Sequence, residues 1–237
     1  MGVFEEHLKQ DYTKVFDGNS GTYSFEQIQA MQDSPLKGKN ICVLGSSVIY
    51  GSASNGVAVA EYLAHRYACM VTKSAVSGTT LCSIGANSYV SRIKKLDTSV
   101  KYDLFLVQLS TNDATRGLPM GEIGTYDEKT ITGAIESIIR YVQNTWNCPV
   151  VFLIGSRYRS RGGAQYAQMR QRLLKLQCHY SGLAAIDLWK DDSFNNIDKQ
   201  QRVLYMADDI HPTKAGYRDW WGPEIDRQLI SICEALK

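Results

Sequence analysis

The chain has 237 residues, of which 44% are hydrophobic and 21% are charged. This composition excludes an intrinsically disordered chain, and the length suffices for one α/β domain with a sizeable core. The 26 basic residues nearly balance the 24 acidic ones, so the formal net charge is only +2. Nucleic-acid-binding proteins are usually far more basic, and we therefore expect no nucleic-acid partner.

The six cysteines form no Cys-x-x-Cys pair, which argues against zinc-finger and thioredoxin-type sites. Cys42 and Cys148 lie inside apolar runs, where a cysteine most often serves as a small core residue. An even number would allow three disulfides, but in a chain of this length we expect reduced thiols.

The sequence begins MGVFEEHLKQ, without a basic segment followed by an apolar one, so we expect no secretory signal. The longest uncharged run, residues 41–60, contains serines, an asparagine and glycines and is unsuited to crossing a membrane. These features predict a cytoplasmic protein with no membrane partner.

Residues 1–38 show no strong core pattern, and we expect them to form an N-terminal helical arm packed on a main domain, residues 39–237. Apolar residues recur there at roughly helical spacing: Val3, Phe4, Leu8, Tyr12 and Phe16. Residues 24–32 read as a short capped helix.

From residue 39 onward, short apolar runs alternate with amphipathic segments. Strands are expected at 40–46, 69–76, 102–110, 149–156 and 183–189. Helices are expected at 56–68 (capped by Asn55), 88–96, 126–146, 162–180 and 212–236, with a polar connection at 190–207. This alternation predicts a parallel sheet with helices on both faces, in which a ligand binds beyond the carboxyl ends of the strands.

Four polar blocks fall where this fold places a binding site. They are GSSVIYG at 45–51, AVSGTT at 75–80, STND at 110–113 and DDIHP at 208–212. Acyl transfer needs a nucleophile, a base, a group that orients the base, and donors for an oxyanion.

The blocks contain each of these groups. A serine on a tight strand-to-helix turn exposes its hydroxyl, and His211 can take its proton. Asp208, three residues earlier, can bond the other imidazole nitrogen. Gly78 can offer a backbone N–H, and Asn112 can aim its side-chain amide at the same point. Pro212 is expected in the first turn of the last helix, with His211 at its mouth.

The four blocks, in this order, resemble those of the SGNH (GDSL-like) hydrolase superfamily. The resemblance implies that Ser47 is the nucleophile, His211 the general base and Asp208 its partner. It also implies an oxyanion hole made by the N–H groups of Ser47 and Gly78 and the side chain of Asn112. The fold implied is α/β, a flavodoxin-like three-layer α/β/α sandwich whose central parallel sheet has five strands here. The chemistry implied is hydrolysis of a small-molecule ester, for example an acetylated sugar, with no metal or other cofactor.

The chain departs from the family pattern at two positions. Ser46 stands where the family has aspartate, which must change the hydrogen bonding of the loop. Ser110 stands where the family has glycine, and we expect its side chain to narrow the site.

Each residue also has a simpler interpretation. Ser47 could be a helix cap and Gly78 an ordinary turn glycine. Asn112 and Asp113 could both be caps, and we expect only Asp113 to be structural. Asp209 competes with Asp208, but the three-residue offset favours Asp208.

Further residues near the blocks are candidates for substrate contact. Arg157 or Arg159, just after the fourth strand, could attract an anionic substrate, although a solvated surface is the simpler interpretation. Thr115, Arg116 and Met120 follow Asn112. A pocket role for the tryptophans is weaker than a packing role: Trp189, Trp220 and Trp221.

We therefore predict a serine esterase that cleaves carboxylic esters of short acyl or O-acetyl groups through a Ser-His-Asp acyl-enzyme mechanism. A carbohydrate O-deacetylase shares this chemistry, and a catalytically silent binding module would share the fold. A nucleotide-binding protein is disfavoured because no G-x-G-x-x-G or G-x-x-x-x-G-K-[ST] motif follows the first strand.

Overall fold

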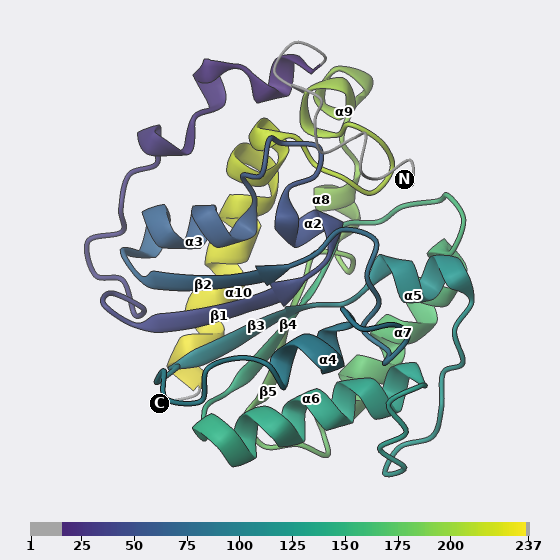
Figure 1. The fold of residues 1–237 in the computed structure, drawn as a ribbon. Coiled ribbons are helices and arrows are strands. Elements are labelled where there is room, and N and C mark those ends of the chain that lie inside the picture. The colour runs from purple at the N-terminus through teal and green to yellow at the C-terminus, as the bar shows by residue number, and fades with distance from the viewer. Residues whose placement is uncertain (1–15, 236–237) are drawn as a thin grey trace.

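The computed structural model describes residues 16–235, and its centre is a parallel sheet of five strands in the order β2-β1-β3-β4-β5 (Figure 1). The strands are β1 (Asn40–Gly45), β2 (Met70–Ala75), β3 (Leu104–Gln108), β4 (Val150–Ile154) and β5 (Leu183–Asp187). This order is that of flavodoxin-like folds. The α/β fold predicted from the sequence is confirmed.

Each inner strand is buried on both faces, because its side chains alternate between two apolar layers. Ile41 and Val43 of β1 belong to one core cluster, and Cys42 and Leu44 belong to the other. The sheet register places Gly45 opposite Ala75. Every strand pairing is parallel, so the carboxyl ends of all five strands lie at the same edge of the sheet.

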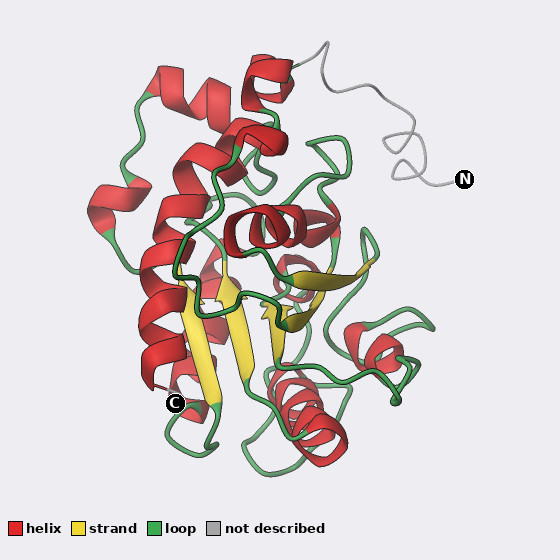
Figure 2. Ribbon diagram, turned by 90° about the vertical axis from the view of Figure 1, so that its left-hand side faces the viewer, coloured by secondary structure: helices red, strands yellow, loops and turns green. Residues whose placement is uncertain are grey.

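Helices cover both faces of the sheet, as Figure 2 shows. The core that contains Cys42 and Leu44 includes residues of α4 (Tyr89–Ile93), α6 (Ile131–Trp146) and α7 (Gly163–Leu176). The opposite core includes residues of α3 (Val59–Tyr67) and α10 (Gly222–Ala235). The three-layer arrangement follows from this packing.

Helix α3 begins later than the sequence indicated, and the expected cap at Asn55 is wrong. Asn55 adopts a left-handed conformation with φ 57°, and the helix starts at Val59 after Ala58. The carboxylate of Glu61 accepts the Ala58 N–H at 2.8 Å. This acid in the first turn replaces the missing side-chain cap.

The segment 190–207 is not merely a polar connection, because it contains α8 (Asp192–Asn195) and α9 (Lys199–Tyr205). Asp191 caps the first by accepting the N–H groups of Ser193 and Phe194. Asp198 and Gln201 form a reciprocal capping box at the start of the second. The sequence did not predict these two helices, because they lie in a polar stretch with little apolar periodicity.

The last helical segment also begins differently from the prediction. Pro212 is not in its first turn but forms an antiparallel bridge with Met206. Thr213 accepts the Gly216 N–H at 3.2 Å and so ends the extended stretch. The π-helical turn η4 (Gly216–Trp221) then leads into α10.

The described part of the N-terminal segment, residues 16–38, contains three short 3₁₀ turns at Asp17–Asn19, Gly21–Tyr23 and Phe25–Gln27. Phe25 and Leu36 are buried in the core beside α3. The longer helix expected at 24–32 is thus one turn, while the helical spacing at Val3–Tyr12 lies outside the described residues.

Two further findings concern the described residues. None of their helices is long and apolar enough to cross a membrane. Cys42 and Cys148 are buried without a disulfide, as their apolar neighbours indicated.

Candidate active site

The first block forms a tight turn from β1 into the short helix α2 (Ser47–Tyr50). Gly45 is required there, since a Cβ would lie 2.3 Å from the Ile49 side chain and 2.8 Å from Gln108 Oε1. The Ser46 N–H donates to Gln108 Oε1 at 2.9 Å. Gln108, at the end of β3, thereby holds the turn that presents Ser47.

Ser47, His211 and Asp208 form one hydrogen-bonded chain. His211 Nε2 lies 2.8 Å from Ser47 Oγ, although the two residues are 164 positions apart in sequence. His211 Nδ1 lies 2.7 Å from Asp208 Oδ2. Such a chain orients the imidazole so that its outer nitrogen faces the hydroxyl.

Asp208 also shapes the loop that carries the histidine. Its Oδ1 accepts the N–H groups of Ile210 at 2.7 Å and His211 at 2.8 Å. The Ala207 N–H donates to the His211 carbonyl at 2.9 Å. One carboxylate therefore fixes both the backbone and the ring of His211, whereas Asp209 turns away to pair with Arg202.

These bonds determine the charge on Asp208. The partial loss of hydration at the carboxylate would by itself raise its pKa, but the hydrogen bonds from the His211 ring and from two backbone amides outweigh this effect and lower the pKa from 3.8 to about 2. Asp208 is therefore ionised throughout the neutral range.

The second and third blocks meet beside the first. Ser77 Oγ lies 2.6 Å from Oγ of Ser52, the residue directly after the first block. Asn112 Nδ2 donates to the Thr79 carbonyl at 2.8 Å. Gly78 lies between these two anchored residues with φ 74°, a conformation that favours glycine.

The Asn112 amide has a second hydrogen that this bond leaves available. Asn112 belongs to α5 (Thr111–Arg116). Arg116, considered above as a substrate contact, donates instead to the Gly78 carbonyl at 2.9 Å. Asn112 and Arg116 thus hold the Gly78 turn from the same helix.

The side chains flanking Asn112 turn inward. Asp113 is fully buried and accepts the N–H groups of Leu81 and Cys82 at 2.7 and 2.9 Å. Ser110 is also fully buried and caps α5. The expectation that Ser110 narrows the site is wrong, because its hydroxyl points to the helix N-terminus.

Two residues that build the site were not predicted from the sequence. Gln108 was treated only as part of a strand, although a polar residue at the end of a buried strand was a signal. Arg92 of α4 is 8% exposed and donates to the carbonyls of Gly45 (2.6 Å) and Ser74. Burial lowers the pKa of its guanidinium. Arg92 joins the ends of β1 and β2 below the turn.

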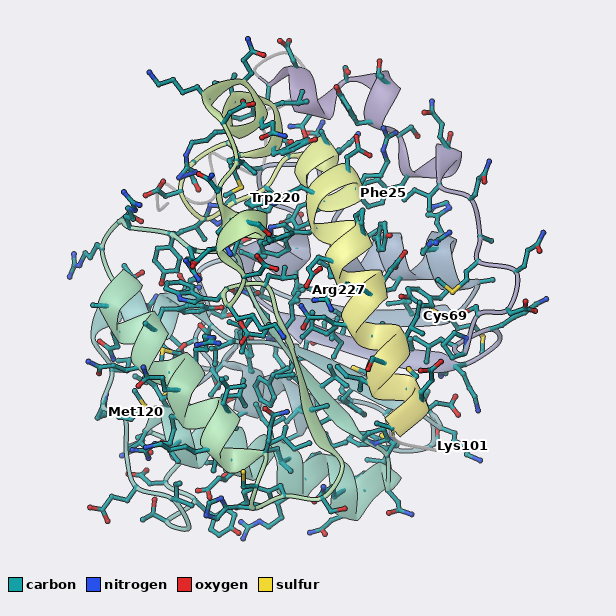
Figure 3. All side chains as sticks on the ribbon, turned by 180° about the vertical axis from the view of Figure 1, so that it is seen from behind. Phe25, Cys69, Lys101, Met120, Trp220 and Arg227 are labelled. Atoms are coloured by element: carbon teal, nitrogen blue, oxygen red, sulfur yellow. The ribbon has the colours of Figure 1, made fainter. Side chains whose placement is uncertain are left out.

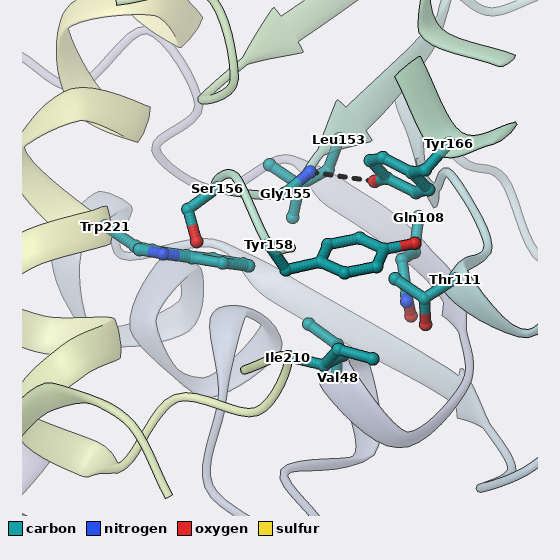
Figure 4. A pocket seen from close by; sticks show the side chains of 10 residues that line it. All are labelled: Val48, Gln108, Thr111, Leu153, Gly155, Ser156, Tyr158, Tyr166, Ile210 and Trp221. Atoms are coloured by element: carbon teal, nitrogen blue, oxygen red, sulfur yellow. Dashed lines mark hydrogen bonds between the residues drawn. The ribbon is translucent and has the colours of Figure 1, made fainter. Parts of the chain in front are cut away.

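A small cavity of about 10 Å³ lies against the first, third and fourth blocks (Figure 4). Val48, Thr111 and Ile210, which line it, are the chain neighbours of Ser47, Asn112 and His211. The ring of Tyr158 lies between Trp221 and the side formed by Gln108 and Thr111, as Figure 4 shows. We call this cavity the inner pocket.

The arginines and tryptophans after β4 have several environments. Arg170 pairs with Asp187 at 2.6 Å, which is a structural role. Trp221 is 2% exposed, packs in the core and lines the inner pocket.

No group of His, Cys, Asp and Glu residues suited to a metal ion occurs between residues 16 and 235.

This fold and this arrangement define an α/β protein that carries a Ser-His-Asp hydrogen-bonded chain at the carboxyl edge of a flavodoxin-type sheet. The model of the GDSL-like Lipase/Acylhydrolase family matches residues 43–218. The chain belongs to this family and is a hydrolase of it; the family acts on small-molecule esters.

Solved structures share the fold. A Lactobacillus plantarum protein has 22% sequence identity and a TM-score of 0.69, covering 82% of this chain and 98% of its own. A lipase/acylhydrolase from Enterococcus faecalis has 18% identity and a TM-score of 0.56, covering 84% and 97%. A member of the lipolytic G-D-S-L family from Veillonella parvula has 15% identity and a TM-score of 0.57, covering 79% and 96%. No curated protein matches the chain.

Proposed function

We propose that this protein is a serine esterase that hydrolyses short-chain acyl esters, O-acetyl esters included, through an acyl-enzyme. The observation that supports it best is the continuous chain from Ser47 Oγ to His211 Nε2 (2.8 Å) and from His211 Nδ1 to Asp208 (2.7 Å). A nucleophile bonded to a base that a third group orients is the arrangement nucleophilic catalysis requires.

In this mechanism His211 takes the proton of Ser47 as Oγ attacks the ester carbonyl. The C–O bond to the alcohol then breaks, and His211 returns the proton to the leaving oxygen. A water molecule, deprotonated by His211, releases the acyl group and restores Ser47. Asp208 stays ionised and stabilises the imidazolium formed in both steps.

The oxyanion of each tetrahedral intermediate is assigned to three donors. The Ser47 N–H begins α2, so it has no acceptor within that helix. The Gly78 N–H lies in the turn held by Asn112 and Arg116. The third donor is the second hydrogen of the Asn112 amide. Donors fixed before the reaction stabilise developing charge without reorganisation.

The inner pocket supports a short acyl group. About 10 Å³ holds roughly one water-sized group, and a methyl group is of similar size. Its apolar wall includes Val48 and Ile210. We assign an acetyl-sized acyl group to this space, which lies beside the chain neighbours of Ser47, Asn112 and His211.

Replacement of Asn112 by alanine is expected to lower kcat by about 10²–10³-fold, because one oxyanion donor is lost. Steady-state kinetics on an aryl acetate measures this effect. Asn87→Ala, an exposed change, should leave kcat unaltered. An Asn112→Ala enzyme with wild-type kcat would remove Asn112 from the oxyanion hole.

Stability should depend on pH through Asp208. Its pKa is lower in the folded protein (about 2) than the ordinary 3.8, so its stabilising effect is full above about pH 4–5 and declines as the pH falls toward 2. The side chain is 57% exposed, so solvent screening keeps the effect below about 1 kcal/mol. Urea unfolding should show a larger difference between wild type and Asp208→Asn at pH 5 than at pH 3. An equal difference at both pH values would contradict the assigned pKa.

Two other functions suit the same fold. A carbohydrate O-deacetylase would use the same chemistry on a sugar ester and differs only in how the alcohol is bound. A silent binding module would not react at Ser47 with a fluorophosphonate. The cytoplasmic location, the division at residue 38 and the absence of a nucleic-acid partner remain predictions from the sequence.

A further inference from the structure

A second, larger hollow of about 610 Å³ lies next to the inner pocket. We call it the arginine groove. Its main lining residues are Arg157, Arg159, Asp192, Asn195, Arg202 and Trp220. Cavities of this volume suit small polar molecules of one or two rings.

The arginine groove and the inner pocket share their walls. In the loop after β4, Ser156 and Tyr158 line the inner pocket, while Arg157 and Arg159 line the groove. A second pair of chain neighbours is divided in the same way: Trp221 lines the inner pocket and Trp220 lines the arginine groove.

The groove also adjoins the loop that carries the triad. Arg202, in its lining, pairs with Asp209 at 3.2 Å, and Asp209 follows Asp208 directly. The groove therefore borders the segment that carries Asp208 and His211, and a group bound in it would lie on the same side of the protein as the triad.

The floor of the groove is preorganised. The Arg157 guanidinium donates to the carbonyls of Trp189 (2.6 Å) and Lys190 (2.9 Å) and pairs with Asp192. The Arg157 N–H donates to Asn195 Oδ1 at 2.7 Å.

The aromatic wall is held equally firmly. Trp220 Nε1 donates to the Phe194 carbonyl at 3.0 Å, and the two rings stack with centroids 5.1 Å apart. Trp220, labelled in Figure 3, belongs to η4 directly before α10, and its hydrogen bond joins η4 to Phe194 of α8.

The arginine groove carries an excess of positive charge. Asp192 pairs with Arg157, and Asp209 pairs with Arg202 across an exposed 3.2 Å contact. Arg159 is exposed and makes no ion pair within residues 16–235. A guanidinium fork binds carboxylates and phosphates in a bidentate manner.

We propose that the arginine groove binds the alcohol part of the ester and that this part is a sugar or similar polyol bearing an anionic group, a carboxylate or a phosphate. Asn195, Ser193 and Asn196 offer hydrogen bonds to hydroxyls, and Arg159 binds the anion with Arg202 beside it. The inference rests on the proposed esterase function and specifies its substrate class.

The test compares three O-acetylated sugars of similar size: glucuronic acid, glucose 6-phosphate and neutral glucose. A small aryl acetate measures catalysis without the groove. We expect kcat/KM for at least one anionic ester to exceed that of the glucose ester by about tenfold, the effect of a charge-assisted hydrogen bond. The ester with the higher kcat/KM shows whether the groove prefers a carboxylate or a phosphate.

The decisive variant is Arg159→Gln, and its matched control is Arg161→Gln, which removes the same charge two residues away and outside the groove. Arg159→Gln should remove the roughly tenfold preference and leave the aryl acetate unaffected, while Arg161→Gln should retain the preference. Equal rates for all three sugar esters, or equal behaviour of the two variants, would overturn the proposal.

Binding to the Ser47→Ala protein separates the groove from the reaction. Calorimetric titration of this protein with the anionic esters should show saturable binding that Arg159→Gln in the same background weakens. If the wild type cleaves the aryl acetate but this binding is absent, only the groove assignment fails. If the binding is present but no ester is cleaved, the esterase assignment fails and the anion site stands.

Discussion

Replacement of Ser47 by alanine is expected to lower kcat on an aryl acetate by about 10⁴–10⁶-fold, leaving only the residual rate that the oxyanion donors and substrate binding provide. The alanine protein keeps the turn, because the bond from the Ser46 N–H to Gln108 and the bond from Arg92 to the Gly45 carbonyl do not involve the Ser47 hydroxyl. Its stability toward urea should therefore remain close to that of wild type.

The adjacent residue, Ser46, supplies the control variant for Ser47→Ala. Ser46 contributes chiefly its backbone N–H, which donates to Gln108 Oε1 at 2.9 Å, whereas its hydroxyl makes only a 3.4 Å contact. Ser46→Ala should therefore keep most of the activity. Loss of activity in Ser46→Ala together with near-normal turnover in Ser47→Ala would reverse the assignment of the nucleophile.

Replacement of His211 by alanine should cost nearly as much, about 10⁴–10⁶-fold in kcat, since nucleophile and base act as a unit. Without the imidazole 2.8 Å from Ser47 Oγ, the hydroxyl has no base and the leaving alcohol has no proton donor. Steady-state and burst kinetics on an activated ester measure both losses.

His179 provides the comparison for this variant. It is exposed in the loop after α7, with its Nδ1 3.0 Å from the Lys175 carbonyl, and it belongs to none of the four blocks. His179→Ala should be indistinguishable from wild type. The double variant Ser47→Ala/His211→Ala should be no slower than either single variant, and additive losses would argue that the two side chains act separately.

The fold followed from the sequence because its strongest signals are apolar runs bounded by turns. The run ICVL in β1 and the run VVFLI in β4 are buried on both faces, and such runs alternate with amphipathic helices. This pattern admits few arrangements other than a parallel sheet covered on both sides.

Helix boundaries were less predictable, because caps compete over a few residues. Asn55 is a good cap by residue type, yet it adopts φ 57° and Glu61 satisfies the start of α3 instead. Pro212 fits a first helical turn, but pairing with Met206 keeps it extended. In both cases a competing contact only a few residues away set the boundary.

The members of the candidate site could be named from the sequence because the fold brings the loops after parallel strands to one edge. The structure places Ser47, His211 and Asp208 in one hydrogen-bonded chain and links Asn112 to the Gly78 turn. Their roles in catalysis remain a proposal.

The roles of the supporting residues could not be assigned from the sequence. Gln108, Arg92 and Arg116 act through contacts with backbone atoms of distant segments. Gln108 stands out as a polar residue at the end of a buried strand, but no local pattern identifies the partner of any of the three. The arginine groove depends likewise on how α8 and α9 fold over the loop after β4. Only the cluster of arginines was visible beforehand.

The reaction of the protein with a fluorophosphonate tests the central claim most directly. Peptide mass spectrometry should locate one adduct per chain at Ser47, and hydrolysis of the aryl acetate should fall in proportion to the labelled fraction. An adduct at another residue, or full activity after complete labelling of Ser47, would contradict the proposed acyl-enzyme.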